Sequence, residues 1–388
     1  MGDRHQAVAS LVIAAETSKA ALLALSTPGV LPPNDQHPSL EVLHKDLASL
    51  LSLVYSDSTK LSIALKPSKP TYSASVAVLK ELSTHILALS ANVNLFDEIK
   101  HGATLKAEAT HVVRDVIEAV NGLLQTFLDL NADGRPATSG SGAAGEEYLV
   151  KTGTIHDLVE RARGPNGISK DNRSAVRKRW AEDRSTLEDA LKEVTEAIED
   201  AEQEDSEDGG EKDEWEEEND AEWAEWGISA TKMTKDELEQ AKAIHPLLRV
   251  TTLLHKRILL DLLAPAAPAL SSGGPTLDTL LSHSTSLQSA FDNLVAVTLY
   301  PSERKNGVLP AIDAFGAVLN NLNTTIDLLL PEQNLEGKMA ALEVADGAVG
   351  KQGCKQNRDM RKWFDMCFQQ VHKLADNARA RASNTQPS

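Results

Sequence analysis

Hydrophobic residues recur in steps of three and four along most of the chain. In the first half, this spacing runs through Leu40–Leu65, Leu79–Phe96 and Leu105–Leu130. Side chains spaced in this way lie on one stripe of an α-helix, whereas the residues of a half-buried β-strand alternate at every second position. No run of Val, Ile and Phe between glycine-rich turns indicates a parallel sheet. The pattern therefore predicts an all-α protein.

Proline residues separate the predicted helices of the first half. Pro28 follows a first helix over about residues 4–26, and Pro67 and Pro70 stand between the second and third helices. Proline lacks a backbone amide hydrogen, so it often marks the end of a helix. Amphipathic helices of this length bury their apolar stripes against one another, and we therefore expect an antiparallel helical bundle.

The same spacing returns in the second half, after about residue 238. We expect four helices there, the first of them bent or restarted near Pro246: residues 238–262, 277–294, 308–329 and 357–381. A second helical bundle is thus predicted.

The net charge of −18 is concentrated in one segment. Between Glu196 and Trp226 the chain has 17 carboxylates and a single base, Lys212, whereas the remainder holds 40 acidic and 38 basic residues. Carboxylates at this density repel one another, and the segment has no apolar stripe to bury. We therefore expect this segment to be disordered.

These patterns divide the chain into two halves. We predict an N-terminal helical bundle over residues 1–200, with a Gly/Ser-rich loop at 131–146, and a C-terminal bundle over residues 233–382. A disordered acidic linker over residues 201–232 separates the two bundles, and residues 383–388 form a disordered tail.

The nearly neutral remainder of the chain argues against nucleic acid as a direct partner. Neutralising a phosphate backbone requires a concentrated basic face. Two mildly basic stretches exist, Arg161–Arg184 and Lys351–Arg381. We interpret both as solvated helix faces.

Cysteine usage and the N-terminus indicate a compartment. The two cysteines, Cys354 and Cys367, are too few for a disulfide framework and are expected to be unpaired thiols of a reducing environment. Glu16 and Lys19 interrupt the apolar run Leu11–Ala15, so we expect neither a secretory signal nor a membrane span. The expected location is cytoplasm and nucleus.

Two motif matches lack the context that their chemistry requires. Gly140–Gly145 fits GxGxxG, but a helix and a loop precede it instead of a strand. Asp129–Gly134 resembles the start of a calcium-binding loop, but Gly140 stands where the bidentate glutamate is needed. We predict neither a cofactor nor a metal site.

The sequence also contains no recognisable catalytic constellation. HExxH, CxxC and the nucleophile elbow are absent, and the 11 histidines are scattered. His85 and His111 adjoin apolar stripes and are expected to be partly buried within the bundle. We therefore assign no catalytic residues and predict that the chain is not an enzyme.

Three of the five tryptophans, Trp215, Trp223 and Trp226, lie in the most acidic stretch of the chain. One interpretation is an acidic–aromatic motif that folds on a partner, with tryptophan as the anchor. The alternative is that one or two of these rings dock on the chain's own bundle and tether the linker. We take all three as candidate partner-binding residues.

Several short strings resemble the cyclin-D-binding (GCIP) protein family. They are His101–Leu105 at the start of a long helix, Ile168–Arg173, and Asn293–Pro301, with a Trp-containing acidic stretch before the second half. Their order covers about residues 70–375, and the chain is identified as a divergent, fungal-like member. It departs from the animal proteins in its proline-rich N-terminal segment, its Gly/Ser loop and its basic C-terminal end.

The resemblance implies a regulator of cell-cycle progression or transcription in the nucleus and cytoplasm. Animal members bind D-type cyclins and helix-loop-helix transcription factors, so these are the expected partners. An alternative is a structural or cytoskeletal adaptor, because vinculin-like and talin-like modules are also Leu/Ala-rich helical bundles poor in aromatic residues.

Overall fold

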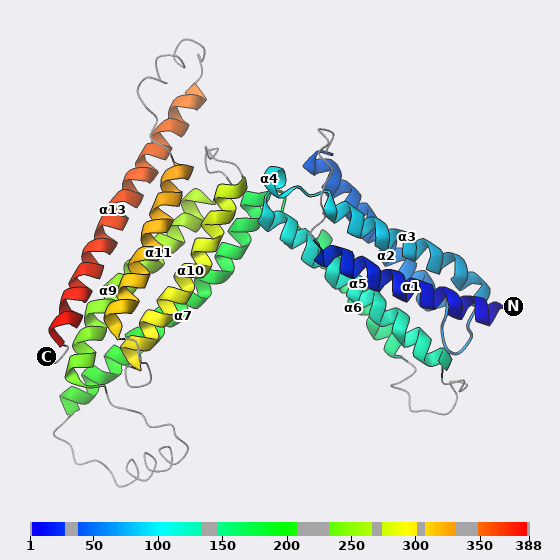
Figure 1. Cartoon of the computed structure of the whole chain (residues 1–388), viewed down its shortest axis with the longest axis horizontal. Coiled ribbons are helices and arrows are strands. Elements are labelled where there is room, and N and C mark those ends of the chain that lie inside the picture. The colour runs from blue at the N-terminus through cyan, green and yellow to red at the C-terminus, as the bar shows by residue number, and fades with distance from the viewer. Residues whose placement is uncertain are drawn as a thin grey trace, which may run out of the picture. The chain divides into compact units, whose positions relative to one another are not determined.

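The computed structural model describes residues 2–27, 38–132, 146–207, 233–265, 274–300, 307–330 and 348–385 (Figure 1). Every regular element in these ranges is a helix, which confirms the all-α prediction. The helices group into two compact units, Met1–Ala175 and Val176–Ser388. Each unit has its own hydrophobic core.

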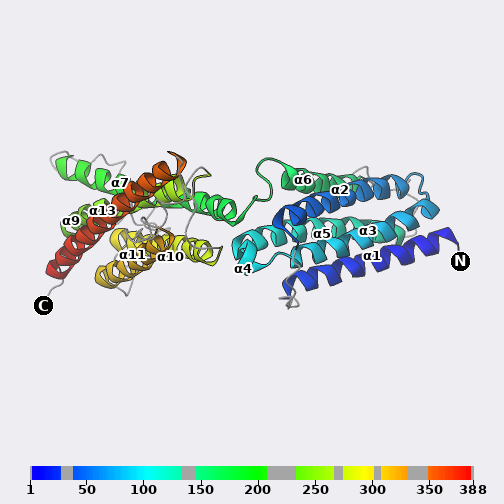
Figure 2. The ribbon, with the colours of Figure 1, turned by 90° about the horizontal axis from the view of Figure 1, so that it is seen from above.

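The first unit is a bundle of long helices that lie side by side (Figure 2). Its elements are α1 (Asp3–Ser26), α2 (Leu40–Ala64), α3 (Tyr72–Asn94), the single turn α4 (Glu98–His101), α5 (Ala103–Ala132) and α6 (Glu147–Arg163). Helix α1 packs on α3 and α5, while α2 packs on α3 and α6. The core between them consists mainly of leucine, valine and alanine, as the aliphatic stripes predict.

The second unit contains the remaining helices. They are α7 (Asn172–Glu207), α9 (Lys235–Arg257), the π-helical turn η1 (Ile258–Leu262), α10 (Gly274–Leu299), α11 (Val308–Leu329) and α13 (Ala348–Thr385). Helix α9 contacts α10 and α13, and α11 contacts α10 and α13. Thr234 and Glu237 form a capping box at the start of α9, so this helix begins where its sequence dictates.

The boundary between the units differs from the predicted one. It falls after Ala175 and not after residue 200. The reason lies in α7, whose buried residues Trp180, Leu187 and Val194 belong to the core of the second unit. Most of this helix is therefore part of the second bundle.

Two helix ends and the interior of one helix also differ from the predictions. Helix α7 continues to Glu207, into the segment predicted to be disordered, and Lys242 of α9 lies 2.7 Å from Glu202, where it offsets part of the local negative charge. Helix α13 runs to Thr385, beyond the predicted start of the tail. Helix α9 passes through Pro246 without a break, and its irregularity is the π-helical turn that follows. Residues 208–232 and 386–388 lie outside the described residues.

Helices α1 and α3 are long and apolar enough to cross a membrane, by length and composition alone. Core helices of soluble proteins meet the same criterion, and both helices bury one face in the first unit, with Leu11 and Leu82 fully covered. The predicted absence of a membrane partner stays a prediction.

Cys367 of α13 is a free, buried thiol, as expected for an unpaired cysteine. Burial raises the pKa of this thiol to about 11. The side chain of Cys354 lies outside the described residues.

Candidate functional site

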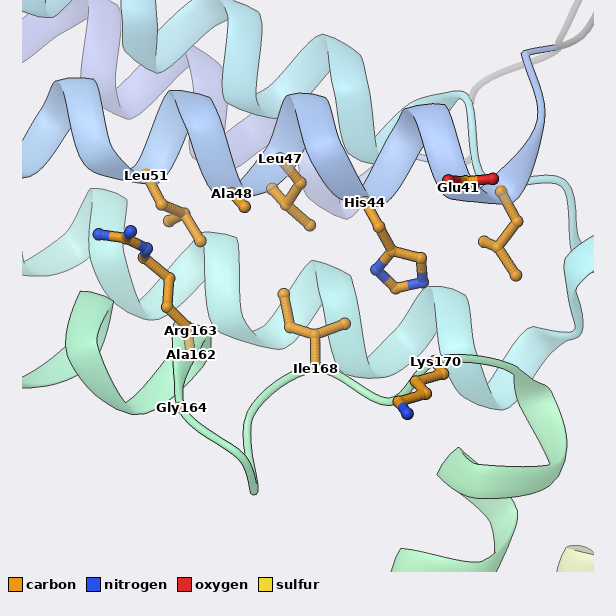
Figure 3. A pocket seen from close by; sticks show the side chains of 11 residues that line it. Glu41, His44, Leu47, Ala48, Leu51, Ala162, Arg163, Gly164, Ile168 and Lys170 are labelled. Carbon is orange, nitrogen blue, oxygen red and sulfur yellow. The ribbon is translucent and has the colours of Figure 1, made fainter. Parts of the chain in front are cut away.

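A groove opens on the first unit between the first three turns of α2 and the segment that follows α6 (Figure 3). Its volume is about 640 Å³. The floor is apolar, and four polar side chains project at its edges: Glu41, His44, Arg163 and Lys170. The complete lining is Leu40, Glu41, His44, Leu47, Ala48, Leu51, Ala162, Arg163, Gly164, Ile168 and Lys170.

The wall opposite α2 is a tight turn after the end of α6. The amide of Gly167 donates to the Gly164 carbonyl at 3.0 Å, and the amide of Ile168 donates to the Ala162 carbonyl at 3.2 Å. A Cβ atom at Gly167 would meet the Ala162 carbonyl oxygen at 2.0 Å, so only glycine allows this close approach. The turn brings Ile168 back over the groove, where it faces the α2 side chains (Figure 3).

His44 is the half-buried polar residue of the groove. Burial lowers the pKa of its ring below the ordinary value, and a hydrogen bond between the ring and the Lys170 backbone partly offsets this effect. The Nε2 of the ring is buried and has no hydrogen-bond partner among the described residues.

The charges around the groove fall into two groups. Three carboxylates serve the helix ends and the turn: Glu41 lies in the first turn of α2, Glu108 accepts the Ser169 amide at 3.0 Å, and Asp171 accepts the Ser174 amide at 2.8 Å. Arg163 and Lys170 are exposed on the opposite wall. Within the described part of the chain, neither of these cations forms an ion pair.

Two of the strings that carried the family resemblance meet next to the groove. Gly102 has a φ of +92°, and the side chain of Asn172 occupies the space that a Cβ at Gly102 would need, with Cγ 1.9 Å from that position. The Asn172 Oδ1 accepts the Leu105 amide at 3.0 Å and so satisfies a free amide at the start of α5. Asn172 thus holds the segment after α6 against the first turn of α5.

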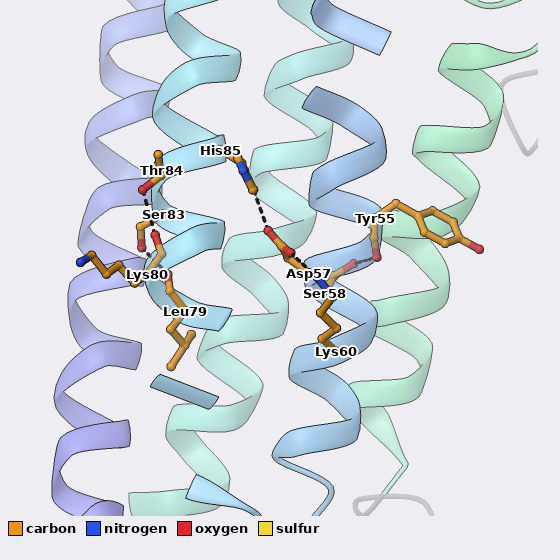
Figure 4. Close-up of polar contacts among 9 residues, drawn as sticks. All are labelled: Tyr55, Asp57, Ser58, Lys60, Leu79, Lys80, Ser83, Thr84 and His85. Atoms are coloured by element: carbon orange, nitrogen blue, oxygen red, sulfur yellow. Dashed lines mark hydrogen bonds and ion pairs between the residues drawn. The ribbon is translucent and has the colours of Figure 1, made fainter. Parts of the chain in front are cut away.

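The histidines highlighted by the sequence have different environments. His85 is partly buried, as predicted, and its Nδ1 lies 2.7 Å from Oδ2 of the buried Asp57 (Figure 4). The prediction for His111 was wrong, because its side chain is 67% exposed and lies 3.5 Å from Asp115. The buried stripe of α5 passes through Val113 instead of Val112, which turns His111 toward solvent.

The other candidate residues gain no support from the geometry. Trp215, Trp223 and Trp226 lie outside the described residues, as do Asp133 and Gly134 of the calcium-loop-like string. Asn131 of that string is still helical, and its Oδ1 accepts the Tyr72 hydroxyl at 3.3 Å. Among the described residues, no three His, Cys, Asp or Glu side chains are grouped to hold a metal ion.

A different polar cluster lies in the second unit, inside its core. The His255 ring stacks on Trp180 with 4.4 Å between the ring centroids, and the indole Nε1 donates to the His255 carbonyl at 3.0 Å. Ser284 Oγ donates to Asp183 Oδ2 at 2.6 Å, so its oxygen accepts from His255 Nε2 at 3.0 Å. Burial, and secondly the charge of Arg184, lowers the pKa of His255 to about 3.

The order of this cluster differs from that of a nucleophile and its base. In serine hydrolases the histidine accepts the serine proton, whereas here the serine donates to the carboxylate. His255 and Ser284 are also fully buried. The arrangement joins α7 to α9 and α10, and it offers no reacting atom to a substrate.

The groove is the feature that sequence reasoning missed. Its floor residues were interpreted as core, and Arg163 and Lys170 only as part of a solvated basic stretch. The Ile168–Arg173 string was the one signal that pointed to this place. An apolar floor with convergent polar groups is the usual form of a binding site.

Comparison with known families supports the resemblance. Residues 46–200 match the family described as Grap2 and cyclin-D-interacting, N-terminal. This confirms the resemblance for a stretch that begins within α2, ends within α7 and includes most of the groove. A comparison with curated proteins finds no match.

Proposed function

We propose that the chain, whose residues 46–200 match a cyclin-D-interacting family, is a non-enzymatic regulator that binds other proteins through its helical surfaces. The expected partners are D-type cyclins and helix-loop-helix transcription factors, in cytoplasm and nucleus. Its binding would modulate cell-cycle progression or transcription without any chemical step on the partner.

The family match is the observation that carries this proposal. The groove supports it, because most of its lining lies within the matched residues and its volume is in the range of binding sites. Its apolar floor and charged edges are features of surfaces that recognise proteins.

Binding of a purified D-type cyclin to the immobilised full chain tests the proposal. We expect saturable binding that a mitotic B-type cyclin does not reproduce. A second arm uses a helix-loop-helix domain in place of the cyclin. The proposal would be contradicted if the helix-loop-helix domain did not bind and the two cyclin classes either bound equally well or did not bind at all.

Two further measurements test the role of the acidic segment and the adaptor alternative. Deletion of residues 201–226 tests the acidic segment, and unchanged cyclin affinity would remove the three tryptophans from the interaction. Co-sedimentation with actin filaments tests the adaptor alternative, which the aliphatic core of the first unit supports. The regulator proposal predicts no co-sedimentation.

A further inference from the structure

We propose that the groove between α2 and the segment after α6 binds an amphipathic helix with leucine-type anchors on one face and carboxylates along one flank. This inference rests on the proposed function only in taking the occupant to be a segment of another protein. It names the chemistry of that segment and the side chains that receive it.

The shape of the groove favours a helix of about three turns. The α2 wall extends from Leu40 to Leu51, eleven residues apart, which corresponds to about 16 Å along a helix axis. Along this wall the half-buried Ala48 faces the groove, and Leu47 and Leu51, each only 1% exposed, form the floor beside it (Figure 3). Apolar side chains at i, i+3 or i+4 and i+7 of an occupant would fall at matching intervals.

The charges specify the flank of the occupant. Arg163 and Lys170 stand exposed on the same wall, on either side of Ile168, and the carboxylates nearby already serve helix starts and backbone amides. A helix with glutamates on the side facing this wall would neutralise both cations. A helix with lysines there would meet like charge.

Fluorescence anisotropy with three labelled peptides tests the proposal on the full-length chain. The first peptide is a helix-forming 15-mer with leucines at i, i+4 and i+7 and glutamates on one flank. The second carries lysines in place of the glutamates, and the third carries alanines in place of the leucines. We expect saturable binding of the first peptide alone, with an affinity that falls as salt rises.

Variants of the chain assign that binding to the groove. The double variant Arg163→Glu, Lys170→Glu should lower the affinity for the acidic peptide by about tenfold and raise the affinity for the lysine peptide. Ala48→Phe should abolish binding of the acidic peptide, because the added ring would occupy the groove beside the half-buried position 48. The matched control is Lys80→Glu, an exposed charge reversal on α3 away from the groove, which should leave binding unchanged.

Each contrary outcome has a distinct meaning. Equal affinity for the glutamate and lysine peptides, or no effect of the double reversal, overturns the assignment of an acidic partner. If no peptide binds and the chain instead self-associates in a way that Ala48→Phe abolishes, the occupant of the groove is a second copy of the chain. That result also overturns the assignment of an acidic partner. Cyclin binding that survives in Ala48→Phe would retain the proposed function while removing the groove from it.

Discussion

The two units treat their polar side chains in opposite ways. The first unit displays Arg163 and Lys170, both exposed, at the wall of an open groove. The second unit encloses His255, Ser284 and Asp183 in a linked cluster beneath Trp180, in which the His255 Nδ1 alone has no partner among the described residues. Hydrogen-bonded groups inside a core fix the packing of helices, whereas exposed charges at an edge are available to a partner.

This contrast separates stability from recognition within one chain. Changes in the enclosed cluster should destabilise the second unit without altering the groove. Changes at the groove wall should alter binding and leave both units folded. Substitutions in each unit can test this division.

Removing the indole of Trp180 should have the largest effect on stability. Trp180→Ala leaves a cavity in the second core and removes the indole N–H that donates to the His255 carbonyl. The free energy of unfolding of this unit should therefore fall by about 3–5 kcal/mol. Hydrogen exchange followed by mass spectrometry should show lower protection in α9, α10 and α11. The half-buried Trp363 is the matched control, and an equal loss in Trp363→Ala would argue against a special role for the cluster.

The largest single effect in the first unit is expected at Gly102. Gly102→Ala forces a Cβ into a backbone with positive φ and against the Asn172 side chain, which should destabilise the unit by about 2–4 kcal/mol. Amide exchange in α5 and α6 measures this effect.

Glycines elsewhere in the unit provide the control. Gly153 lies within α6 with open space around it, so Gly153→Ala should stabilise by about 0.5–1 kcal/mol. Adding Asn172→Gly to Gly102→Ala should relieve the clash and leave the backbone strain. The double variant also loses the hydrogen bond from the Leu105 amide to Asn172, so a double variant no more stable than the single one would show that relief of the clash does not exceed the loss of that bond.

Acidification should weaken the second unit through His255. Its pKa is about 3 in the folded state and near 6.5 when unfolded, so protons bind more readily to the unfolded chain. The stabilisation is complete above pH 6.5 and falls by on the order of 1.4 kcal/mol per pH unit as the pH drops from 6.5 toward 3.

Substitution isolates this histidine from the carboxylates that titrate over the same range. His255→Gln keeps a donor for Ser284 but cannot be protonated, so its stability should vary less with pH in urea unfolding between pH 6.5 and 4. His111→Gln changes an exposed histidine and should unfold like the parent chain. If the free energy of unfolding varied with pH in the same way in the parent and in His255→Gln, His255 would not contribute to the acid destabilisation.

The smallest effect on stability is expected at the groove wall. Arg163 and Lys170 are exposed, so reversing both charges should change the free energy of unfolding by less than about 0.5 kcal/mol per site. Thermal unfolding monitored by circular dichroism measures this. A large loss would mean that these cations support the fold, which would blur the division between the units.

The sequence predicted the helices well because each one carries its own apolar period. Ser39 caps α2 and the capping box starts α9, so these helix starts are also locally encoded. The period does not say which bundle a stripe packs into. The stripe of α7 was assigned to the first half, whereas the packing of Trp180, Leu187 and Val194 in the second core places most of this helix in the second unit.

The candidate site was less predictable for a related reason. Its two walls are separated by more than a hundred residues, and Leu47 and Leu51 have the same spacing whether a neighbour covers them or a groove opens beside them. Nothing local distinguishes an Arg163 that lines a groove from one on a plain solvated face. The Ile168–Arg173 string did mark the place, because Asn172 must fit against Gly102.

Cys367 gives the second unit a built-in reporter of breathing motions. A thiol with a pKa of about 11 is almost entirely protonated at neutral pH, and its burial hides it from alkylating reagents. Its labelling rate in a Cys354→Ser background should therefore equal the equilibrium constant for transient detachment of α13, multiplied by the labelling rate of an exposed thiol. The same helix that conceals this sulfur thus makes its own opening equilibrium measurable under native conditions.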